Sequence, residues 1–209
     1  LFRSAEGIEP VVFCTERGGA VADELRRAGA TVEVLSASDR ATEIGVLLRE
    51  HAIDLLNPHF STVGTAPAAA LGIPVVATLH NSYAWVGPAA WDEFRTAARQ
   101  VTAWIAVSRS VADFCARRFA IDPARIEVIP NGARFVRARD TMVERRRRRE
   151  RLGIPVEIEM LLQVGAVSRV KSQFALVDAV AALRHRRPNL VAWIAGPTGE
   201  ADYEEAIRR

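Results

Sequence analysis

The sequence predicts an α/β protein with two Rossmann-like domains, each built on a parallel β-sheet. Three observations lead to this fold class. Strand-length runs rich in valine and isoleucine recur along the chain. Segments with apolar residues at helical spacing lie between those runs, which is the pattern of a parallel sheet covered on both faces. A Pro-Asn-Gly turn at 130–132 breaks the alternation, and a new strand follows only after an arginine-rich stretch.

Eight segments have the composition of buried strands and form the predicted sheets. They are Val11 to Cys14, Thr31 to Leu35, Ile53 to Asn57, Val75 to His80, Trp104 to Val107, Ile126 to Ile129, Ile158 to Val164 and Leu190 to Ala195. Three apolar stripes at i, i+3, i+4 spacing predict helices that cover the first sheet. They are Val21, Leu25 and Ala28; Ile44, Leu47 and Leu48; and Val111, Phe114 and Cys115. Either Ser108 or Ser110 is placed to cap the third helix.

The turn sets the predicted domain boundary. Residues 1–132 form the first domain, residues 133–157 a basic linker and helix, and residues 158–209 the start of the second domain. Six arginines crowd into residues 145–151, but Glu144 and Glu150 accompany them and no aromatic residue interleaves with them. We therefore interpret the run as a solvated helix face and do not predict nucleic acid as a partner.

Composition indicates an ordinary globular protein. The chain has 209 residues, 49% of them hydrophobic and 25% charged, with a formal net charge of +3. No apolar run approaches the roughly 20 residues that a membrane-spanning helix needs. Cys14 and Cys115 stand apart without CxxC spacing, which favours a reducing compartment over a disulfide framework. We expect a cytoplasmic protein, with membrane association left open, and a polypeptide that continues before Leu1 and after Arg209.

Polar residues that follow a buried strand are the first candidates for a site, because ligands of parallel sheets bind beyond the carboxyl ends of the strands. His80 and Asn81 follow one predicted strand directly. A strand-end imidazole can bind a hydroxyl or phosphate group or stabilise developing charge, although a lone histidine is more often structural. His59 is a weaker candidate, since Pro58 indicates a turn.

Three aromatic residues downstream of His80 have two interpretations. Tyr83, Trp85 and Trp91 follow it in a predicted loop. They could pack a hydrophobic acceptor, but packing within the core or the loop is the favoured interpretation.

A second candidate site lies where the strand ending at Val164 meets the next helix. Gly165 ends that strand, and Arg169 and Lys171 precede the helix. A glycine at a strand end lets the backbone approach a ligand, and cations before a helix N-terminus complement its amide donors, so these three residues are candidate diphosphate ligands. The alternative is two solvated cations on a loop.

The motifs of several other reaction classes do not occur in the sequence. It contains no Walker A loop and no GxGxxG fingerprint. It also has no GxSxG elbow, HExxH motif or aspartate-rich metal loop. The remaining residues point to recognition of phosphate and sugar by positioned donors, without a metal.

Taken in order, five segments resemble the retaining GT-B glycosyltransferases of group 1, also called family 4. Gly72 to Asn81 is similar to the family's "G-(I/V)-P-V-V-x-T-x-H" strand, and Trp104 to Ser110 to its next strand and serine turn. Ile126 to Gly132 resembles the "(V/I)-I-x-N-G-(V/I)-D" stretch near the end of the first domain. Val164 to Ser172 resembles the donor loop "V-G-R-L-x-x-x-K-G", and Trp193 to Pro197 the strand and glycine turn after it.

The resemblance implies a GT-B fold and transfer of a sugar from a nucleotide-diphosphate donor to a hydroxyl acceptor, with retention at the anomeric carbon. The acceptor is a glycan, a lipid or a small molecule; no metal or cofactor is implied, and a peripheral membrane contact is left open. His80 would act as the catalytic residue near the sugar, and Lys171 would contact the diphosphate. Four further positions are expected to line the cleft: Asn81, Ser108, Asn131 and Gly132.

Departures from the family pattern leave alternatives open. Ala166 stands where the family has arginine, and Ser172 where it has glycine. The family's glycine-rich acceptor loop would precede Leu1 and its paired glutamates would follow Arg209, so we expect this stretch alone to be inactive. The alternatives are a degenerate binding domain, which Ala166 favours, and another sugar-nucleotide enzyme such as an epimerase.

Overall fold

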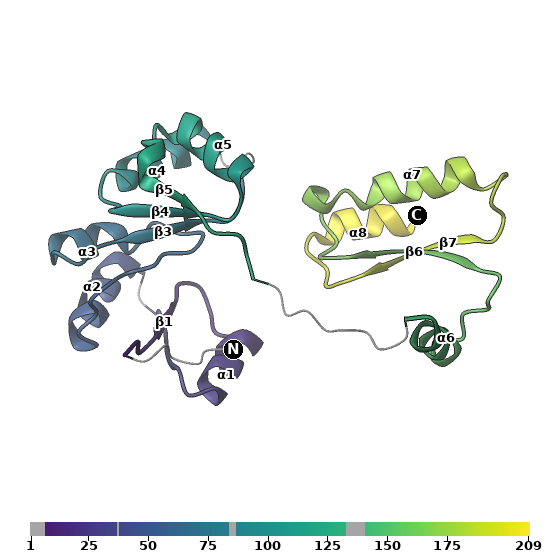
Figure 1. Cartoon of the computed structure of the whole chain (residues 1–209), viewed down its shortest axis with the longest axis horizontal. Coiled ribbons are helices and arrows are strands. Elements are labelled where there is room, and N and C mark those ends of the chain that lie inside the picture. Colours follow the sequence, from purple (N-terminus) through teal and green to yellow (C-terminus); the bar gives the residue numbers. More distant parts are fainter. Residues whose placement is uncertain (1–6, 37, 84–86, 133–140) are drawn as a thin grey trace. The chain divides into compact units, whose positions relative to one another are not determined.

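The computed structural model describes residues 7–36, 38–83, 87–132 and 141–209. The chain divides into two compact units, residues 1–133 and 134–209 (Figure 1). Every strand ladder in the described residues is parallel, and helices alternate with the strands. The parallel α/β class predicted from the sequence is therefore confirmed.

The first unit contains a two-stranded sheet, β1-β2, and a three-stranded sheet in the order β3-β4-β5. Its strands are β1 (Val11–Cys14), β2 (Thr31–Val34), β3 (Val76–Leu79), β4 (Ala103–Ala106) and β5 (Ile126–Val128). Its helices are α1 (Ala20–Arg27), α2 (Arg40–Glu50), α3 (Thr65–Ala70), α4 (Pro88–Ala98) and α5 (Arg109–Phe119), and the 3-10 turn η1 covers Pro123–Arg125. Figure 1 shows α4 and α5 on one side of the three-stranded sheet and α2 with α3 on the other.

Two of the three predicted helix faces are confirmed. Ile44 and Leu48 of α2 are buried, as is Cys115 of α5. The face predicted for α1 is wrong, because Val21 is 71% exposed while Ala22 is buried. The Arg26 side chain lies on the Ala22 face of α1 and donates to the carbonyl oxygen of Val32, so this face of the helix is the one next to β2.

The segment predicted as a strand at Ile53 to Asn57 contains only an isolated parallel bridge, Leu56 to Val75, and a second bridge follows at His59 to Thr78. Proline explains the interruption. In a parallel ladder every second residue donates to the neighbouring strand, so the next donor to β3 after Leu56 would be residue 58. That residue is Pro58, which has no N–H group. The Pro58 carbonyl still accepts from Thr78, so the segment stays beside β3 without forming a regular strand.

An aromatic cluster between β4 and the helices α4 and α5 forms part of the core of the first unit. Trp104 of β4 lies 5.6 Å from the ring of Phe94 on α4, and Phe94 lies 4.2 Å from Phe119 on α5, between ring centroids. Trp104 is 2% exposed and Phe119 equally so. Tyr83 joins the same cluster. Aromatic pairs at these distances add to the stabilisation from burial of their area, so this cluster helps to hold α4 and α5 on the sheet.

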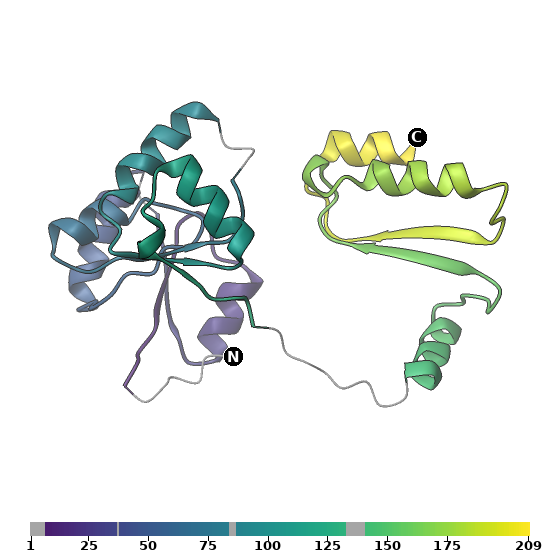
Figure 2. The ribbon, with the colours of Figure 1, turned by 45° about the horizontal axis from the view of Figure 1, so that its top comes forward.

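The second unit contains α6 (Thr141–Arg151), β6 (Glu159–Val164), α7 (Gln173–Leu183), β7 (Leu190–Ala195) and α8 (Ala201–Arg208), with a 3-10 turn η2 at Arg169–Lys171. Figure 2 shows α7 and α8 together on one side of the β6-β7 pair. Val164 and Trp193 of this sheet are exposed.

The arginine-rich run forms helix α6, as predicted. Arg146 bonds to Glu150 at 3.1 Å and Arg148 to Glu144 at 2.7 Å, each one turn apart on the helix surface. These side chains are largely exposed, so the run is a solvated helix with internal ion pairs. Among the helices that the structure describes, none has the length and apolar character to cross a bilayer.

Replacing Trp104 tests the aromatic cluster. Trp104→Ala should cost about 3–5 kcal/mol of unfolding free energy because it opens a large cavity in a closely packed core. Trp104→Phe should cost clearly less than Trp104→Ala, because it leaves a smaller cavity, keeps a ring beside Phe94 and removes an indole Nε1 that has no hydrogen-bond partner among the described residues. Urea denaturation of both variants measures the difference; equal losses would contradict this account of the core.

Candidate functional site

The parallel sheet brings the candidate residues of the first unit to one edge. Leu79 of β3, Ala106 of β4 and Val128 of β5 are aligned in register at the carboxyl ends of their strands. The residues that follow these three strand ends therefore emerge at the same edge. They are His80 and Asn81 after β3, Ser108 after β4, and Asn131 and Gly132 after β5.

A pair of histidines lies at this edge. His59 Nδ1 and His80 Nε2 are 2.7 Å apart, a hydrogen-bond distance between the two imidazole rings. The ring of Phe60 stacks on His80, with centroids 4.3 Å apart and planes 15° from parallel. Phe60 itself is 66% exposed. The weaker sequence candidate, His59, thus contacts the stronger one directly.

Partial loss of hydration lowers the pKa of both imidazoles, although His59 is largely exposed and His80 is partly buried. Loss of hydration lowers the pKa of His59, and the neighbouring His80 lowers it further. Loss of hydration alone lowers the pKa of His80. Neutral pH therefore favours two uncharged rings, with one nitrogen donating and the other accepting across the 2.7 Å contact.

Two predicted cleft residues also have local structural roles. The Asn81 side chain accepts a hydrogen bond from the Tyr83 backbone N–H at 2.8 Å, which closes the turn after β3. The Ser108 hydroxyl accepts from the Val111 backbone N–H and so caps α5, the first of the two caps considered from the sequence. Asn131 and Gly132 are exposed. Their assignment to a ligand cleft stays a prediction.

The aromatic residues after His80 favour packing over acceptor binding. Tyr83 is 9% exposed in the core. Trp91 is half-buried, with the Arg118 guanidinium 3.4 Å above its ring. Trp85 lies outside the described residues.

The second candidate site is the loop 165–172, which we call the glycine loop. It joins β6 to α7, and its first residue, Gly165, has φ +155°. A Cβ atom on Gly196 would lie 2.0 Å from the Gly165 carbonyl oxygen and 3.2 Å from the Ala166 nitrogen. No side chain fits there, so Gly196 allows the turns after β6 and β7 to pack backbone against backbone.

A buried glutamine holds the glycine loop from the inside. Gln173 is fully buried. Its Nε2 donates to the Ala166 carbonyl at 2.8 Å, and its Oε1 accepts from the Ser168 N–H at 3.3 Å. Gln163 holds the far end, donating to the Lys171 carbonyl at 2.8 Å. The loop conformation is therefore fixed by side chains on both sides of it.

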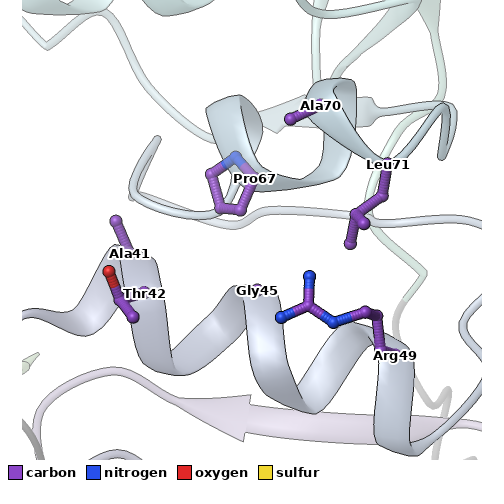
Figure 3. Close-up of a pocket in the computed structure, with 7 residues that line it drawn as sticks. All are labelled: Ala41, Thr42, Gly45, Arg49, Pro67, Ala70 and Leu71. Carbon is purple, nitrogen blue, oxygen red and sulfur yellow. The ribbon is translucent and has the colours of Figure 1, made fainter.

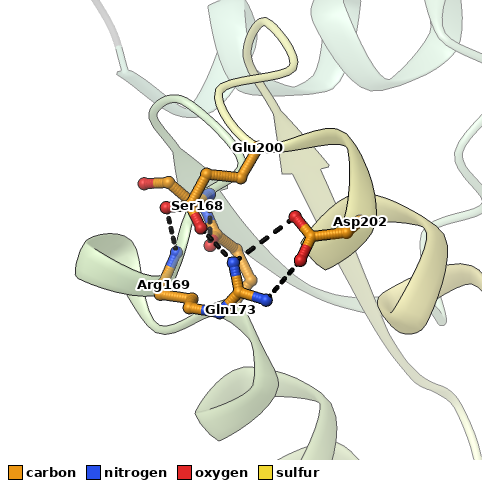
Figure 4. A network of polar contacts seen from close by, with 5 residues as sticks. All are labelled: Ser168, Arg169, Gln173, Glu200 and Asp202. Carbon is orange, nitrogen blue, oxygen red and sulfur yellow. Dashed lines mark hydrogen bonds and ion pairs between the residues drawn. The ribbon is translucent and has the colours of Figure 1, made fainter.

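Arg169, predicted to bind the diphosphate, is held by two carboxylates (Figure 4). Its guanidinium pairs with Glu200 and, at 2.6 Å, with Asp202 at the start of α8. Its backbone N–H also donates to Glu200 at 3.1 Å. Two acidic groups surround one cation, so this cluster carries net negative charge and an anion must compete with it.

Lys171 differs from Arg169 in its surroundings. No hydrogen bond or ion pair of its ammonium group occurs within the described part of the chain, and the residue is exposed. Its aliphatic stem runs past Gly165, where a Cβ would meet the Lys171 Cδ at 3.8 Å. The free cation of the glycine loop therefore lies beside its bare backbone.

Helix α7, which follows the glycine loop, has fewer free backbone N–H groups for a phosphate than the sequence suggested. The 3-10 turn η2 comes before α7, so the lysine lies inside the turn. The Phe174 N–H in the first turn of α7 already donates to the Tyr203 hydroxyl at 3.2 Å. Charge at this site thus depends more on Lys171 than on the helix N-terminus.

A groove of about 320 Å³ lies between α2 and α3, lined by Ala41, Thr42, Gly45, Arg49, Pro67, Ala70 and Leu71 (Figure 3). It is bordered by helices, and Arg49 is the titratable side chain in its lining. The candidate residues at the strand ends do not line it. Within the described residues there is also no cluster of three metal-binding side chains.

Sequence reasoning missed Gln173 and the Phe60 contact, and it named the glycine turn at Gly196 only as part of the family resemblance. A glutamine in this position gives no signal by itself, because its role depends on the loop folding back so that its side chain meets Ala166 and Ser168. The role of Gly196 depends on its contact with Gly165 in the turn after another strand. The Phe60 position depends on a backbone with φ +59°, for which phenylalanine gives no signal.

Comparison with known proteins identifies the family to which the chain belongs. Residues 4–135 match the model described as Glycosyltransferase Family 4. The chain is 30% identical over 199 residues to a D-inositol 3-phosphate glycosyltransferase of Salinispora arenicola (strain CNS-205), which covers 82% of this chain and 44% of that protein. The chain thus spans less than half the length of that relative.

Solved structures share the fold. A crystal structure of Anabaena Alr3699/HepE in complex with UDP-glucose superposes with a TM-score of 0.76 at 18% identity, over 95% of this chain and 64% of that one. A glycosyltransferase from Rickettsia africae ESF-5 gives a TM-score of 0.65 at 14% identity, over 91% of this chain and 61% of that one. The predicted GT-B fold class is confirmed. Because the family model covers more than half of the sequence, the chain belongs to glycosyltransferase family 4.

Proposed function

We propose that the intact protein transfers a glycosyl group from a nucleoside-diphosphate sugar to a hydroxyl acceptor, with retention at the anomeric carbon. The observation that carries this proposal is the glycine loop, which holds a bare backbone next to the free cation of Lys171 at the carboxyl end of β6. Family membership and the fold shared with a UDP-glucose complex support a nucleoside-diphosphate donor.

The glycine loop would bind the donor diphosphate. Gly165 lets the phosphate oxygens approach the main chain, and the Lys171 ammonium offsets the charge that develops on the departing diphosphate. Gln173 and Gly196 fix the loop before the donor arrives, so little ordering is needed on binding. The proposal includes no metal ion.

His80 would act on the sugar side as the catalytic residue. It lies at the carboxyl end of β3, where a parallel sheet presents its ligands, and its ring is uncharged at neutral pH. A neutral imidazole can exchange hydrogen bonds with sugar hydroxyl groups and stabilise charge that develops as the glycosidic bond breaks.

The contacts of Arg169 favour anchoring over direct phosphate binding. Glu200 and Asp202 satisfy its guanidinium and tie the glycine loop to the start of α8. Exposed ion pairs contribute only about 0–1 kcal/mol each to stability, and the Arg169 side chain is 59% exposed. Its main effect would be to keep the loop in place beside Lys171.

The two cations of the glycine loop give a matched pair of variants. Lys171→Ala should weaken binding of UDP by roughly 10- to 100-fold, because it removes a charge-assisted contact worth about 1.5–3 kcal/mol. Lys171→Arg should retain most of the affinity. Arg169→Ala should change affinity by less than about 5-fold. Isothermal titration calorimetry of the intact protein measures all three.

The outcomes separate the alternatives. Absence of UDP binding to wild type would contradict UDP as the donor nucleotide. Absence of binding of the other nucleoside diphosphates as well would remove the donor-site assignment and favour a non-catalytic domain. A larger loss for Arg169→Ala than for Lys171→Ala would show that Arg169 binds the phosphate and exchanges its carboxylate partners.

Replacing His80 tests the catalytic assignment. His80→Ala should lower the turnover of UDP-glucose by roughly 100-fold, since it removes a positioned group that stabilises charge. The affinity for UDP should stay within a few-fold of wild type, because the glycine loop is intact. His51→Ala, in the same unit but paired with Glu33, is the control. An unchanged rate for His80→Ala would contradict the assignment, and NMR of the product anomer tests retention.

A further inference from the structure

The His80 ring is constrained from several directions. Its Nε2 lies 2.7 Å from His59 Nδ1, and Phe60 stacks on one of its faces. The His80 backbone N–H also contacts the Tyr83 hydroxyl at 3.4 Å. His59, the weaker candidate from the sequence, occupies one of the two nitrogens of the predicted catalytic ring.

A hydrogen bond between two neutral imidazoles contains one proton. That proton lies either on His80 Nε2 or on His59 Nδ1, and the choice fixes the tautomer of both rings. The Nε2–H tautomer is the more stable one for a free histidine side chain. Both rings adopt it when His80 Nε2–H donates to His59 Nδ1, which leaves His80 Nδ1 as a hydrogen-bond acceptor.

We propose that His59 is a positioning residue that holds the His80 imidazole in this single tautomer and orientation, so that His80 Nδ1 accepts a hydrogen bond from a hydroxyl group of the sugar substrate. The identity of the substrate in this inference rests on the proposed function. The arrangement of His59 and His80 does not. It adds to the site a residue that does not touch the substrate itself but orients the His80 side chain, which does.

The backbone next to His59 supports the inference. Phe60 has φ +59°, a left-handed conformation that is unfavourable for a bulky side chain. That conformation accompanies the stacking of its ring on His80, although the ring remains 66% exposed. This unfavourable backbone conformation therefore lies where two consecutive side chains, His59 and Phe60, contact His80.

The charges around the pair are consistent with a neutral dyad. Burial raises the pKa of Cys115, whose thiol donates to the Asn81 carbonyl, to about 11. Burial also raises the pKa of Tyr83, so both groups stay protonated and uncharged at neutral pH. The lowered pKa values of His59 and His80 have no contribution from a carboxylate or a cation in the described residues.

Nitrogen NMR of the histidine rings tests the tautomer directly. The sequence contains four histidines, so their ring signals can be assigned by substitution. In the intact wild-type protein near pH 7.5, without ligand, His80 should show one protonated and one unprotonated ring nitrogen. His59→Asn, whose Oδ1 can replace Nδ1 as acceptor, should keep this pattern. His59→Phe should give averaged signals from two exchanging tautomers.

Kinetics with UDP-glucose provide the second readout. His59→Phe should lower kcat by roughly 10-fold or more, the size of effect seen when a residue that orients a metal-binding histidine is removed. His59→Asn should keep most of the wild-type kcat. The KM for UDP-glucose should change less than kcat. Averaged His80 signals in wild type, or equal kcat for His59→Phe and wild type, would overturn the inference. If no sugar transfer occurs at all, the NMR result still decides the tautomer, and only the proposed function fails.

The pair also predicts a pH dependence of stability. Both pKa values lie below the ordinary 6.5, so the unfolded chain binds more protons than the folded one between 6.5 and the lowered values. The contribution of the pair is therefore complete above about pH 6.5 and is lost as the pH falls through the folded pKa values. His59→Asn should lose less unfolding free energy than wild type between about pH 7.5 and pH 5. Equal losses in urea titrations would contradict a neutral pair in the folded protein.

Discussion

Parallel pairing of the strands is the constraint on which the candidate chemistry depends. Leu79, Ala106 and Val128 end their strands in register, so every residue after these ends emerges at one edge. The same holds in the second unit, where Val164 pairs with Ala195 and the turns after β6 and β7 are neighbours. An antiparallel sheet would distribute these residues between two edges. Each unit thus concentrates its polar residues before any side chain makes a specific contact.

The two sites use different means to hold their functional groups. In the second unit, Gly196 removes a side chain so that two backbone turns meet, and Gln173 then links the loop from within. In the first unit, side chains make the contacts, with His59 and Phe60 enclosing His80 on two sides. An exposed loop backbone is suited to a diphosphate, because phosphate oxygens can accept hydrogen bonds from main-chain amides. A ring held in one orientation is suited to sugar hydroxyl groups, because these point in different directions and the ring can select one of them.

Much of the fold could be predicted from the sequence, because apolar periodicity reports burial directly. Seven of the eight predicted strands occur. The exception, at Ile53 to Asn57, has the right composition, but Pro58 removes a ladder donor. The rotation of α1 was mispredicted because the Arg26 contact with Val32 is a tertiary interaction that periodicity does not contain. His80 and Lys171 could be selected by their places after strands, whereas the partners of Arg169 lie some 30 residues away in sequence.

The replacement of the family's arginine by Ala166 has to be considered together with the environment of Arg169. A phosphate site that lost one cation could recover charge from a nearby arginine, but here Glu200 and Asp202 already neutralise that arginine. The free positive charge of the loop is then a single lysine. A site with one cation binds the diphosphate less strongly in the ground state. Catalysis depends on the difference between ground state and transition state, so a weaker ground-state site does not by itself imply an inactive one. For the proposed donor site, the question is therefore whether Lys171 would interact more strongly with a departing diphosphate than with a bound donor.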